Sequence, residues 1–267
     1  YAALAADIKA AFNAQFYNTT LKRYATDGGS GGTTGATQVA QALALDAGLV
    51  PEADREAVLD YLVENIYAFN PSGDGGPHLS GGTIGLAPTV RALTAGGRDA
   101  VLWDVLQQDA QPSYGFFLQP TNANPDGFTT VGEQWNRGAS RNHMILAQIE
   151  EWFHEGLAGI RQAEGSTQYR ELVIKPRVVG DLTSAEGSSR SPPGLIRSGW
   201  ALDVDRFDLT VEIPANTSAE VWVPRPFENE VSPPRRAKFL RTEDGYAVYQ
   251  VGSGVYSFAS AGPPLTS

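Results

Sequence analysis

The sequence contains no cysteine, so disulfide bonds, a thiol nucleophile and a cysteine-ligated zinc site are all excluded. It has only three histidines, His78, His143 and His154, and none lies in the HExxH spacing of a catalytic zinc site. Neither the P-loop pattern nor the GxGxxG pattern that cradles phosphate occurs. We therefore expect neither a bound metal nor another cofactor.

Basic residues and long apolar runs are also scarce. Twenty Lys and Arg residues stand against 30 Asp and Glu residues, and the formal net charge is -10. Nucleic acids and anionic membrane surfaces are bound by basic patches, so the composition argues against both partners. No run approaches the roughly 18 apolar residues of a membrane-spanning helix. A chain of 267 residues can form one large domain or two ordinary ones.

The start of the chain is unusual. It opens on Tyr1 in a segment with helical periodicity, without an initiator methionine or a signal peptide. We interpret it as a processed or excised piece of something longer. Two N-x-S/T sequons, at Asn18 and Asn216, are compatible with glycosylation and an extracellular (secreted) location, although such tripeptides often arise by chance.

Up to about residue 163 the pattern is helical. Leu4, Ile8 and Phe12 keep the spacing of a buried helical stripe. Gly48 is expected to end a second helix, and Pro51 to start a third. The third helix should bury Val58, Leu59, Leu62 and Ile66. A fourth helix is predicted at about 82–95, with Pro88 in its first turns or at a kink. A fifth helix is predicted at about 98–108.

A last, long helix is predicted from an N-cap at Ser140 as far as Ile160. After Gly165 the signal changes to short strands separated by Pro and Gly. Helices followed by such strands indicate an α+β multi-domain chain, with residues 1–165 helical and residues 166–267 forming an antiparallel β-sandwich. The predicted strands cover residues 171–176, 207–214, 219–224, 239–241, 246–251 and 254–258.

Residues 112–143 form a long, loop-like stretch that is rich in Gly, Pro, Asn and aromatic residues and that also carries Glu133 and His143. Aromatic rings stack on the apolar faces of sugars, and polar groups read the sugar hydroxyls. A loop of this length without secondary structure of its own is usually functional. We therefore favour a carbohydrate-processing pocket over the alternative, a lid whose aromatic residues are merely buried.

Helix–loop–helix pairs with Gly-rich insertions, followed by a small sandwich, suggest the α/α toroid of many glycosidases. About six predicted helices make only half of a twelve-helix barrel. The sequence thus predicts a partial (α/α)6 toroid whose N-terminal portion is missing.

An ordered series of segments then resembles a known family. In the helical part they are residues 37–38, 42–45, 48–51, 78–79 and 81–83, PSYG at 112–115, TT at 129–130 before Glu133 and Trp135, SRNH at 140–143, and Trp152 with residues 158–160. In the sandwich they are residues 174–176, 199–200, 213–217 and 251–254. By their order and spacing the chain resembles the C-terminal half of an α-L-rhamnosidase of the glycoside hydrolase 78 type.

The resemblance implies an inverting hydrolase that releases terminal α-L-rhamnose from plant glycosides or polysaccharides. It places the general base at Glu133, and the general acid in the upstream part that this sequence lacks. Because half of a toroid leaves apolar helix faces uncovered, we also expect a partner, the N-terminal portion of the same precursor, bound as a companion chain. Two departures from the family are Gly132, where the family generally has Trp, and a short segment between Glu133 and His143.

Each candidate residue also has a structural interpretation. An ionised base needs polar neighbours, for which Asn136 or Arg137 are the candidates beside Glu133. His143 is expected either to bind sugar hydroxyls or orient Glu133, or to pack beneath the loop.

The remaining candidates are His78, Tyr114 and Trp135. His78, in a Gly-rich segment, is a candidate for the rim of the pocket, and Tyr114 and Trp135 either stack on sugar, support Glu133 or lie in the core. His154, Trp200 and Trp222 are expected to have packing roles or to be exposed.

Two other functions remain open. A polysaccharide lyase or unsaturated-glucuronyl hydrolase uses the same kind of toroid, but a lyase needs cations beside a uronate, and the pocket stretch holds only Arg137 and Arg141. The other alternative is a noncatalytic carbohydrate-binding fragment.

Overall fold

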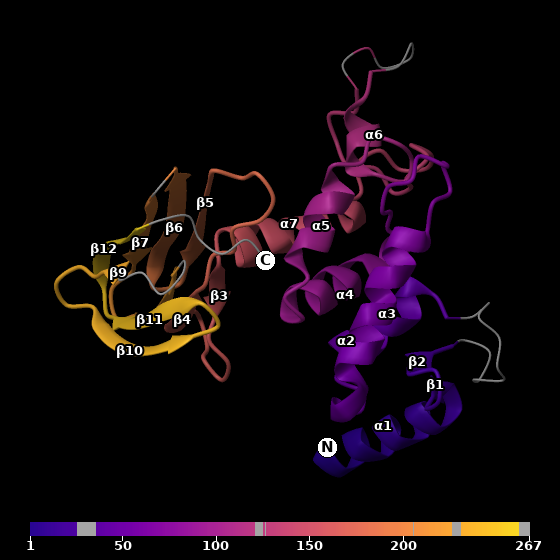
Figure 1. Ribbon diagram of the computed structural model, residues 1–267, viewed down its shortest axis with the longest axis horizontal. Helices are drawn as coiled ribbons and strands as arrows, with labels where there is room; N and C mark the ends of the chain where they lie inside the picture. The colour runs from indigo at the N-terminus through magenta and orange to yellow at the C-terminus, as the bar shows by residue number, and fades with distance from the viewer. Residues whose placement is uncertain (26–35, 121–124, 126, 205, 226–230, 262–267) are drawn as a thin grey trace. The chain divides into compact units, whose positions relative to one another are not determined.

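The computed structural model describes residues 1–25, 36–120, 125, 127–204, 206–225 and 231–261. The chain divides into two compact units, Tyr1–Ile149 and Glu150–Ser267. The first is largely helical and the second is largely β-structure (Figure 1). The first strand of the second unit lies at Ile160–Gln162, before residue 165 where the sequence places the boundary.

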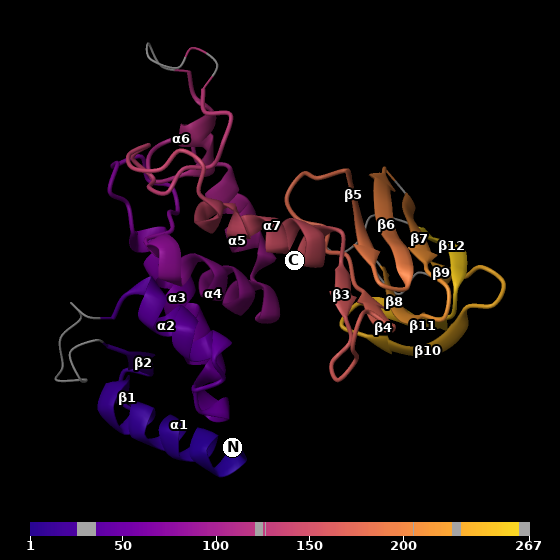
Figure 2. The ribbon, with the colours of Figure 1, turned by 180° about the vertical axis from the view of Figure 1, so that it is seen from behind.

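Helices α2, α3 and α4 pack together in the first unit, and both views show them side by side (Figures 1 and 2). The described elements of this unit are α1 (Ala2–Phe16), β1 (Tyr17–Asn18), β2 (Arg23–Tyr24), α2 (Gln38–Asp46), the 3-10 helix η1 (Glu52–Asp54), α3 (Arg55–Ala68), α4 (Gly82–Ala95), α5 (Asp99–Leu106), α6 (Tyr114–Leu118) and the 3-10 helix η2 (Met144–Ile149).

The predictions for α2 and α4 are confirmed, and so is the buried face of α3; Pro51 starts the 3-10 helix η1, however, and α3 itself begins at Arg55. The Thr37 hydroxyl accepts a hydrogen bond from the Ala40 amide (3.2 Å) at the start of α2, and Gly48 follows the helix with a φ of 66°. The buried residues of α3 are the four predicted ones. Pro88 lies inside α4, in its second turn.

The prediction of a buried stripe on α1 is wrong for the described structure. No residue of α1 is buried, and Leu4 and Ile8 are 57% and 55% exposed. Two polar contacts help to hold the helix: the Lys9 ammonium donates to the Gly48 carbonyl (2.7 Å), and the Asn13 amide donates to the Leu49 carbonyl (2.9 Å). The half-buried Phe12 ring also lies against Tyr24 (centroids 5.8 Å apart). Periodicity reveals that a helix has an apolar face, but not which segment covers that face.

The last predicted helix starts later and ends earlier than the sequence suggests. It begins at Met144 rather than after Ser140, and it continues from η2 through α7 (Glu150–Trp152) and the π-helix η3 (Phe153–Leu157). Ser140 is absent from its start because its backbone and hydroxyl groups bind within the preceding loop. Ile160 lies in a strand, beyond Gly159, whose φ is 73°.

The second unit is a sandwich of two five-stranded sheets with strand orders β10-β11-β8-β4-β3 and β5-β6-β7-β12-β9. Strands β4 and β8 run parallel, and the other described neighbours run antiparallel. The strands are β3 (Ile160–Gln162), β4 (Glu171–Ile174), β5 (Ser184–Ser191), β6 (Gly194–Asp203), β7 (Arg206–Ile213), β8 (Ser218–Pro224), β9 (Val231–Ser232), β10 (Lys238–Glu243), β11 (Tyr246–Val251) and β12 (Gly254–Ala261).

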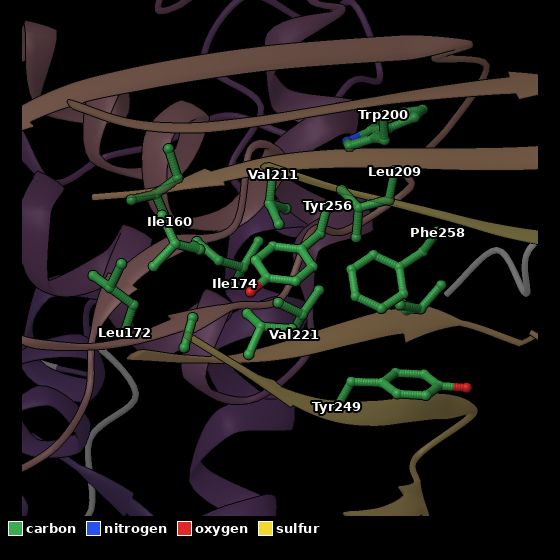
Figure 3. Close-up of a cluster of buried hydrophobic side chains, with 14 of the residues drawn as sticks. Ile160, Leu172, Ile174, Trp200, Leu209, Val211, Val221, Tyr249, Tyr256 and Phe258 are labelled. Carbon is green, nitrogen blue, oxygen red and sulfur yellow. The ribbon is translucent and has the colours of Figure 1, made fainter. Parts of the chain in front are cut away.

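The core of the sandwich lies between its two sheets. Strand β7 alternates buried and accessible residues, as the sequence predicts, so that Phe207, Leu209 and Val211 point inward. Figure 3 shows residues of β7 and β12 facing Val221 and Tyr249 of the other sheet. The sequence analysis missed β3, β5, β6 and β9; β5, with the sequence SAEGSSRS, offers hardly any apolar residue to reveal it.

Candidate active site

The stretch 112–143 is not wholly irregular, contrary to the prediction. It contains the short helix α6, whose start is capped by the Ser113 hydroxyl accepting a hydrogen bond from the Phe116 amide (3.0 Å). The end of α6 is tied to the following segment, because the Phe128 amide donates to the Phe117 carbonyl (2.9 Å). The PSYG motif therefore begins an ordered element.

Residues 129–143 fold back on themselves. The His143 amide donates to the Val131 carbonyl (2.9 Å), and the Glu133 amide donates to the Ser140 carbonyl (2.9 Å). The turn between these segments is tight, with Arg137 and Ala139 in the left-handed region at φ values of 64° and 56°. Such backbone conformations are costly for residues other than glycine and concentrate at functional sites. This fold-back brings Glu133 and His143 onto facing segments of one loop, which we call the base loop.

The Glu133 carboxylate is half-buried and accepts a hydrogen bond from the Ser140 amide (Oε2 to N, 3.2 Å). The expected neighbours Asn136 and Arg137 have other partners. The Asn136 side chain accepts from the Gly138 amide (2.9 Å), and the Arg137 guanidinium donates to the carbonyls of Phe116 and Gln119. The carboxylate is thus contacted by a backbone N–H, where the sequence suggested a side chain.

His143 immediately precedes η2. Its Nδ1 accepts a weak hydrogen bond from the Ile145 amide (3.4 Å), so the ring caps the first turn of that helix. With Nδ1 accepting, the ring proton lies on Nε2. Among the described residues Nε2 has no hydrogen-bond partner, so a donor remains for a ligand.

An aromatic cluster joins the base loop to α6. The Trp135 ring stacks on Phe117 (centroids 5.6 Å apart) and meets Tyr114 edge-on (5.1 Å). The Tyr114 hydroxyl donates to the Leu146 carbonyl (2.7 Å), and burial raises its pKa above the ordinary value. The Trp135 indole N–H is buried without an acceptor in the described part of the chain. These contacts favour support of Glu133 over sugar stacking for Tyr114 and Trp135.

His78 does not lie on an accessible rim. Its side chain is fully buried, Nδ1 lies 2.9 Å from the Pro112 carbonyl, and Nε2 lies 3.0 Å from the Asp74 carboxylate. Both ring nitrogens are therefore occupied, which favours a structural role over a sugar contact.

The two sequons differ in their surroundings. The Asn18 side chain accepts hydrogen bonds from the amides of Thr20 (3.0 Å) and Leu21 (2.8 Å), whereas Asn216 is exposed in the turn between β7 and β8. Glycosylation of either residue remains a prediction.

The sandwich carries a hollow of about 620 Å³ on the outer face of β5, β6 and β7. Its aromatic residue, Trp200, is buried and donates its indole N–H to the Leu157 carbonyl (2.8 Å), so it offers no ring face to a sugar. Among the described residues, no group of three or more His, Asp or Glu side chains is placed to hold a metal. Nor does any described helix combine the length and the hydropathy of a membrane span.

Comparison with known families gives matches over both units. Residues 1–157 match the bacterial α-L-rhamnosidase six-hairpin glycosidase domain, and residues 159–238 match the bacterial α-L-rhamnosidase C-terminal domain. An α-L-rhamnosidase of Streptomyces avermitilis is 35% identical over 239 residues, which are 85% of this chain and 22% of that protein. One from an Alteromonas species is 28% identical over 70% of this chain and 20% of its own length. This chain thus spans about a fifth of these relatives.

Crystal structures of relatives share the fold. The S. avermitilis α-L-rhamnosidase complexed with L-rhamnose has a TM-score of 0.80 and 34% identity, over 97% of this chain and 24% of that one. The α-L-rhamnosidase of Dictyoglumus thermophilum also has a TM-score of 0.80, with 28% identity over 98% of this chain and 28% of that one. The partial toroid and sandwich expected from the sequence are thereby confirmed.

Proposed function

Because the chain belongs to the bacterial α-L-rhamnosidase family of six-hairpin glycosidases, we propose that it forms part of an enzyme that releases terminal α-L-rhamnose from glycosides or polysaccharides. The observation that carries this proposal is the base loop, in which Glu133 and His143 lie on facing segments. Glycoside hydrolysis needs a carboxylate of this kind on one side of the scissile bond.

We assign Glu133 as the general base of an inverting reaction. Its carboxylate takes a proton from water as the water oxygen bonds to the anomeric carbon and the glycosidic bond breaks. A carboxylic acid on the opposite side, roughly 6.5–9.5 Å away, protonates the departing oxygen. The Ser140 amide donates a hydrogen bond to Oε2 of Glu133 and so helps to hold the carboxylate in place.

His143 is assigned to substrate binding. The free Nε2–H is suited to donate to a sugar hydroxyl next to the base. Trp135 attaches the base loop to α6 through its ring contacts with Tyr114 and Phe117, and the Tyr114 hydroxyl is in turn bonded to the Leu146 carbonyl. A lyase is not supported, because carbonyl groups already engage Arg137 and the chain matches a hydrolase family.

The general acid is proposed to come from the N-terminal portion of the same protein. The exposed apolar residues of α1, Leu4 and Ile8, are the kind of surface that a neighbouring helix covers. On this proposal a companion segment packs against the helical unit and completes the site. Extracellular action on plant material is part of the same proposal.

The test is Glu133→Gln in the intact protein that carries this chain. Loss of general-base catalysis lowers turnover of an aryl α-L-rhamnoside by at least about 10²-fold. Glu150→Gln, on an exposed residue of α7, is the matched control and leaves turnover unchanged. Near-normal turnover in a folded Glu133→Gln protein would remove Glu133 from the mechanism. Proton NMR of the first product tests inversion, since an inverting enzyme releases β-L-rhamnose first.

A further inference from the structure

His78 lies in the segment between α3 and α4, and its backbone is anchored on both sides. The His78 amide donates to the Ile66 carbonyl (3.2 Å), and the His78 carbonyl accepts from the Gln38 side chain (3.0 Å). The side chain is completely buried. Its backbone is therefore held by α3 and α2 before any contact of the ring is considered.

The two partners of the ring are both hydrogen-bond acceptors. The Pro112 carbonyl lies 2.9 Å from Nδ1, and both Asp74 carboxylate oxygens lie 3.0 Å from Nε2. Neither partner carries a proton to give, so both bonds form together only when both ring nitrogens are protonated. The ring is then an imidazolium whose counter-charge is Asp74.

The surroundings fit a charged ring. The hydrogen bond to His78 holds the pKa of the Asp74 carboxyl below its usual value, so Asp74 stays ionised. The other described contacts of His78 come from uncharged groups of Ile66, Gln38 and Pro112. A buried ion pair is stable when further hydrogen bonds satisfy both partners. Asp74 also accepts from the Gly76 amide (3.2 Å).

The acceptor Pro112 is the residue at which the candidate site begins. The next residue, Ser113, caps α6, and Phe117 of α6 both binds the Phe128 amide and stacks on Trp135 of the base loop. A second bond reinforces the attachment, because the Ser72 hydroxyl donates to the Gln111 carbonyl. The segment 70–78 thus holds two consecutive carbonyls at the start of the stretch that bears Glu133.

We propose that His78 is a positioning residue of the active site: its doubly protonated ring clamps the Pro112 carbonyl and so sets the position of α6 and of the rings beneath Glu133. The catalytic consequence rests on the proposed function. The contact between His78 and Pro112 does not depend on the proposed function, because it is a property of the folded chain. His78 acts through Pro112 and touches no substrate.

Two substitutions separate the two bonds of the ring. In His78→Asn the amide nitrogen stands near the place of Nδ1 and can still donate to Pro112. In His78→Gln the amide nitrogen stands near the place of Nε2 and faces Asp74, so the bond to Pro112 is lost. The two variants are otherwise similar in polarity, and each is the control for the other.

The measurement is hydrogen exchange in the intact protein. We expect the amides of Phe116 and Phe128 to exchange at least about tenfold faster in His78→Gln than in the parent, as for loss of one buried hydrogen bond to a charged group. In His78→Asn they should stay near parental rates, and amides of β7 should stay unchanged in both. Equal rates in the two variants, fast or slow, would overturn the clamp.

Kinetics and NMR complete the test. In His78→Gln we expect kcat to fall about tenfold more than in His78→Asn, with KM nearly unchanged, since the base and not the sugar contact is displaced. An inactive parent would refute the proposed function but would leave the exchange comparison intact. If His78→Gln fails to fold, nitrogen-15 NMR of the parent decides: two protonated ring nitrogens support the clamp, and a neutral ring overturns it.

Discussion

The two units bury their apolar residues in different ways. In the sandwich, each sheet has one face in the core, so that Leu209 and Phe258 of one sheet meet Val221 and Tyr249 of the other within the unit (Figure 3). In the helical unit, α2, α3 and α4 form a core, but α1 has no buried residue at all. A sandwich supplies both halves of its own core, whereas a helical hairpin needs a neighbour to cover its stripe.

The units also differ in the polar groups that they bury. Gln38, Gln41 and His78 are fully buried in the helical unit, and each bonds to backbone groups of a connecting segment. The interior of the sandwich is mostly hydrocarbon. The helical unit therefore uses interior polar groups to position loops, and the sandwich serves mainly as a self-contained support.

The largest expected effect concerns the sandwich core. Phe207→Ala removes a fully buried ring that stacks on Trp200 (5.8 Å), and it should lower the free energy of unfolding of the sandwich by about 3–5 kcal/mol. Phe12→Ala, on the half-buried face of α1, is the matched change and should cost far less in this chain. Denaturant titration measures both. Similar losses would remove the contrast between the two units.

A second test asks whether α1 is covered in the intact protein. Ile8→Ala should change the unfolding free energy of this chain by less than about 0.5 kcal/mol, because Ile8 is exposed. In the intact protein the same change should cost about 2–4 kcal/mol if a companion segment buries it. Ile66→Ala, in the buried face of α3, should be costly in both. Equal and small effects of Ile8→Ala in the two contexts would contradict the companion proposal.

A third test addresses the first strands of the sandwich. Gly159 has a φ of 73°, and a Cβ there would lie 2.3 Å from the Lys175 carbonyl carbon. Gly159→Ala should therefore destabilise the sandwich by roughly 2–3 kcal/mol, through strain and overlap. Gly165→Ala is the control, since Gly165 has a φ of 77° but open space around it, and it should cost only about 1 kcal/mol. Thermal unfolding of both variants measures the two losses of stability. A larger loss in Gly159→Ala indicates steric overlap in addition to backbone strain, whereas equal losses indicate backbone strain alone.

The smallest expected effect is a pH dependence. Burial lowers the pKa of His154 from its ordinary value of 6.5, against a smaller opposing effect of Glu150. The unfolded chain then binds a proton more readily than the folded chain, so stability is retained above pH 6.5 and declines as the pH falls below it. His154→Gln should flatten this part of the curve. Unfolding midpoints at pH 7.5 and 5.5 should differ less in the variant than in the parent.

Local patterns predicted much of the fold. The buried face of α3 and the limits of α4 and β11 agree with the sequence analysis. The same approach placed Ser140 at the start of a helix, because an N-cap residue before an apolar run is a helix signal. In the structure Ser140 closes the base loop by pairing with Glu133. A serine can bond to the backbone at a helix start or to the backbone of a loop, and only the path of the chain determines which of the two it does.

In the candidate site, too, the sequence indicated some features and only the structure showed others. Glu133 and His143 were chosen from motif order, and the structure places them on facing segments of one loop. The sequence did not reveal that Arg137 bonds to Phe116, or that His78 is clamped between Asp74 and Pro112. The contacts of Arg137 with Phe116 and of His78 with Pro112 join residues that are 21 and 34 positions apart, and no spacing rule covers such separations.

By itself, the sequence determined which faces of its helices and strands are apolar, where several elements stop, and the family to which the chain belongs. Tertiary structure alone decided that β4 pairs in parallel with β8, that the stripe of α1 lies exposed in this chain, and that a buried histidine contacts the start of the stretch that bears Glu133. The reason is physical. Amphipathic periodicity records the environment of a side chain, while the identity of its partner depends on contacts between distant segments that form only when the whole chain packs.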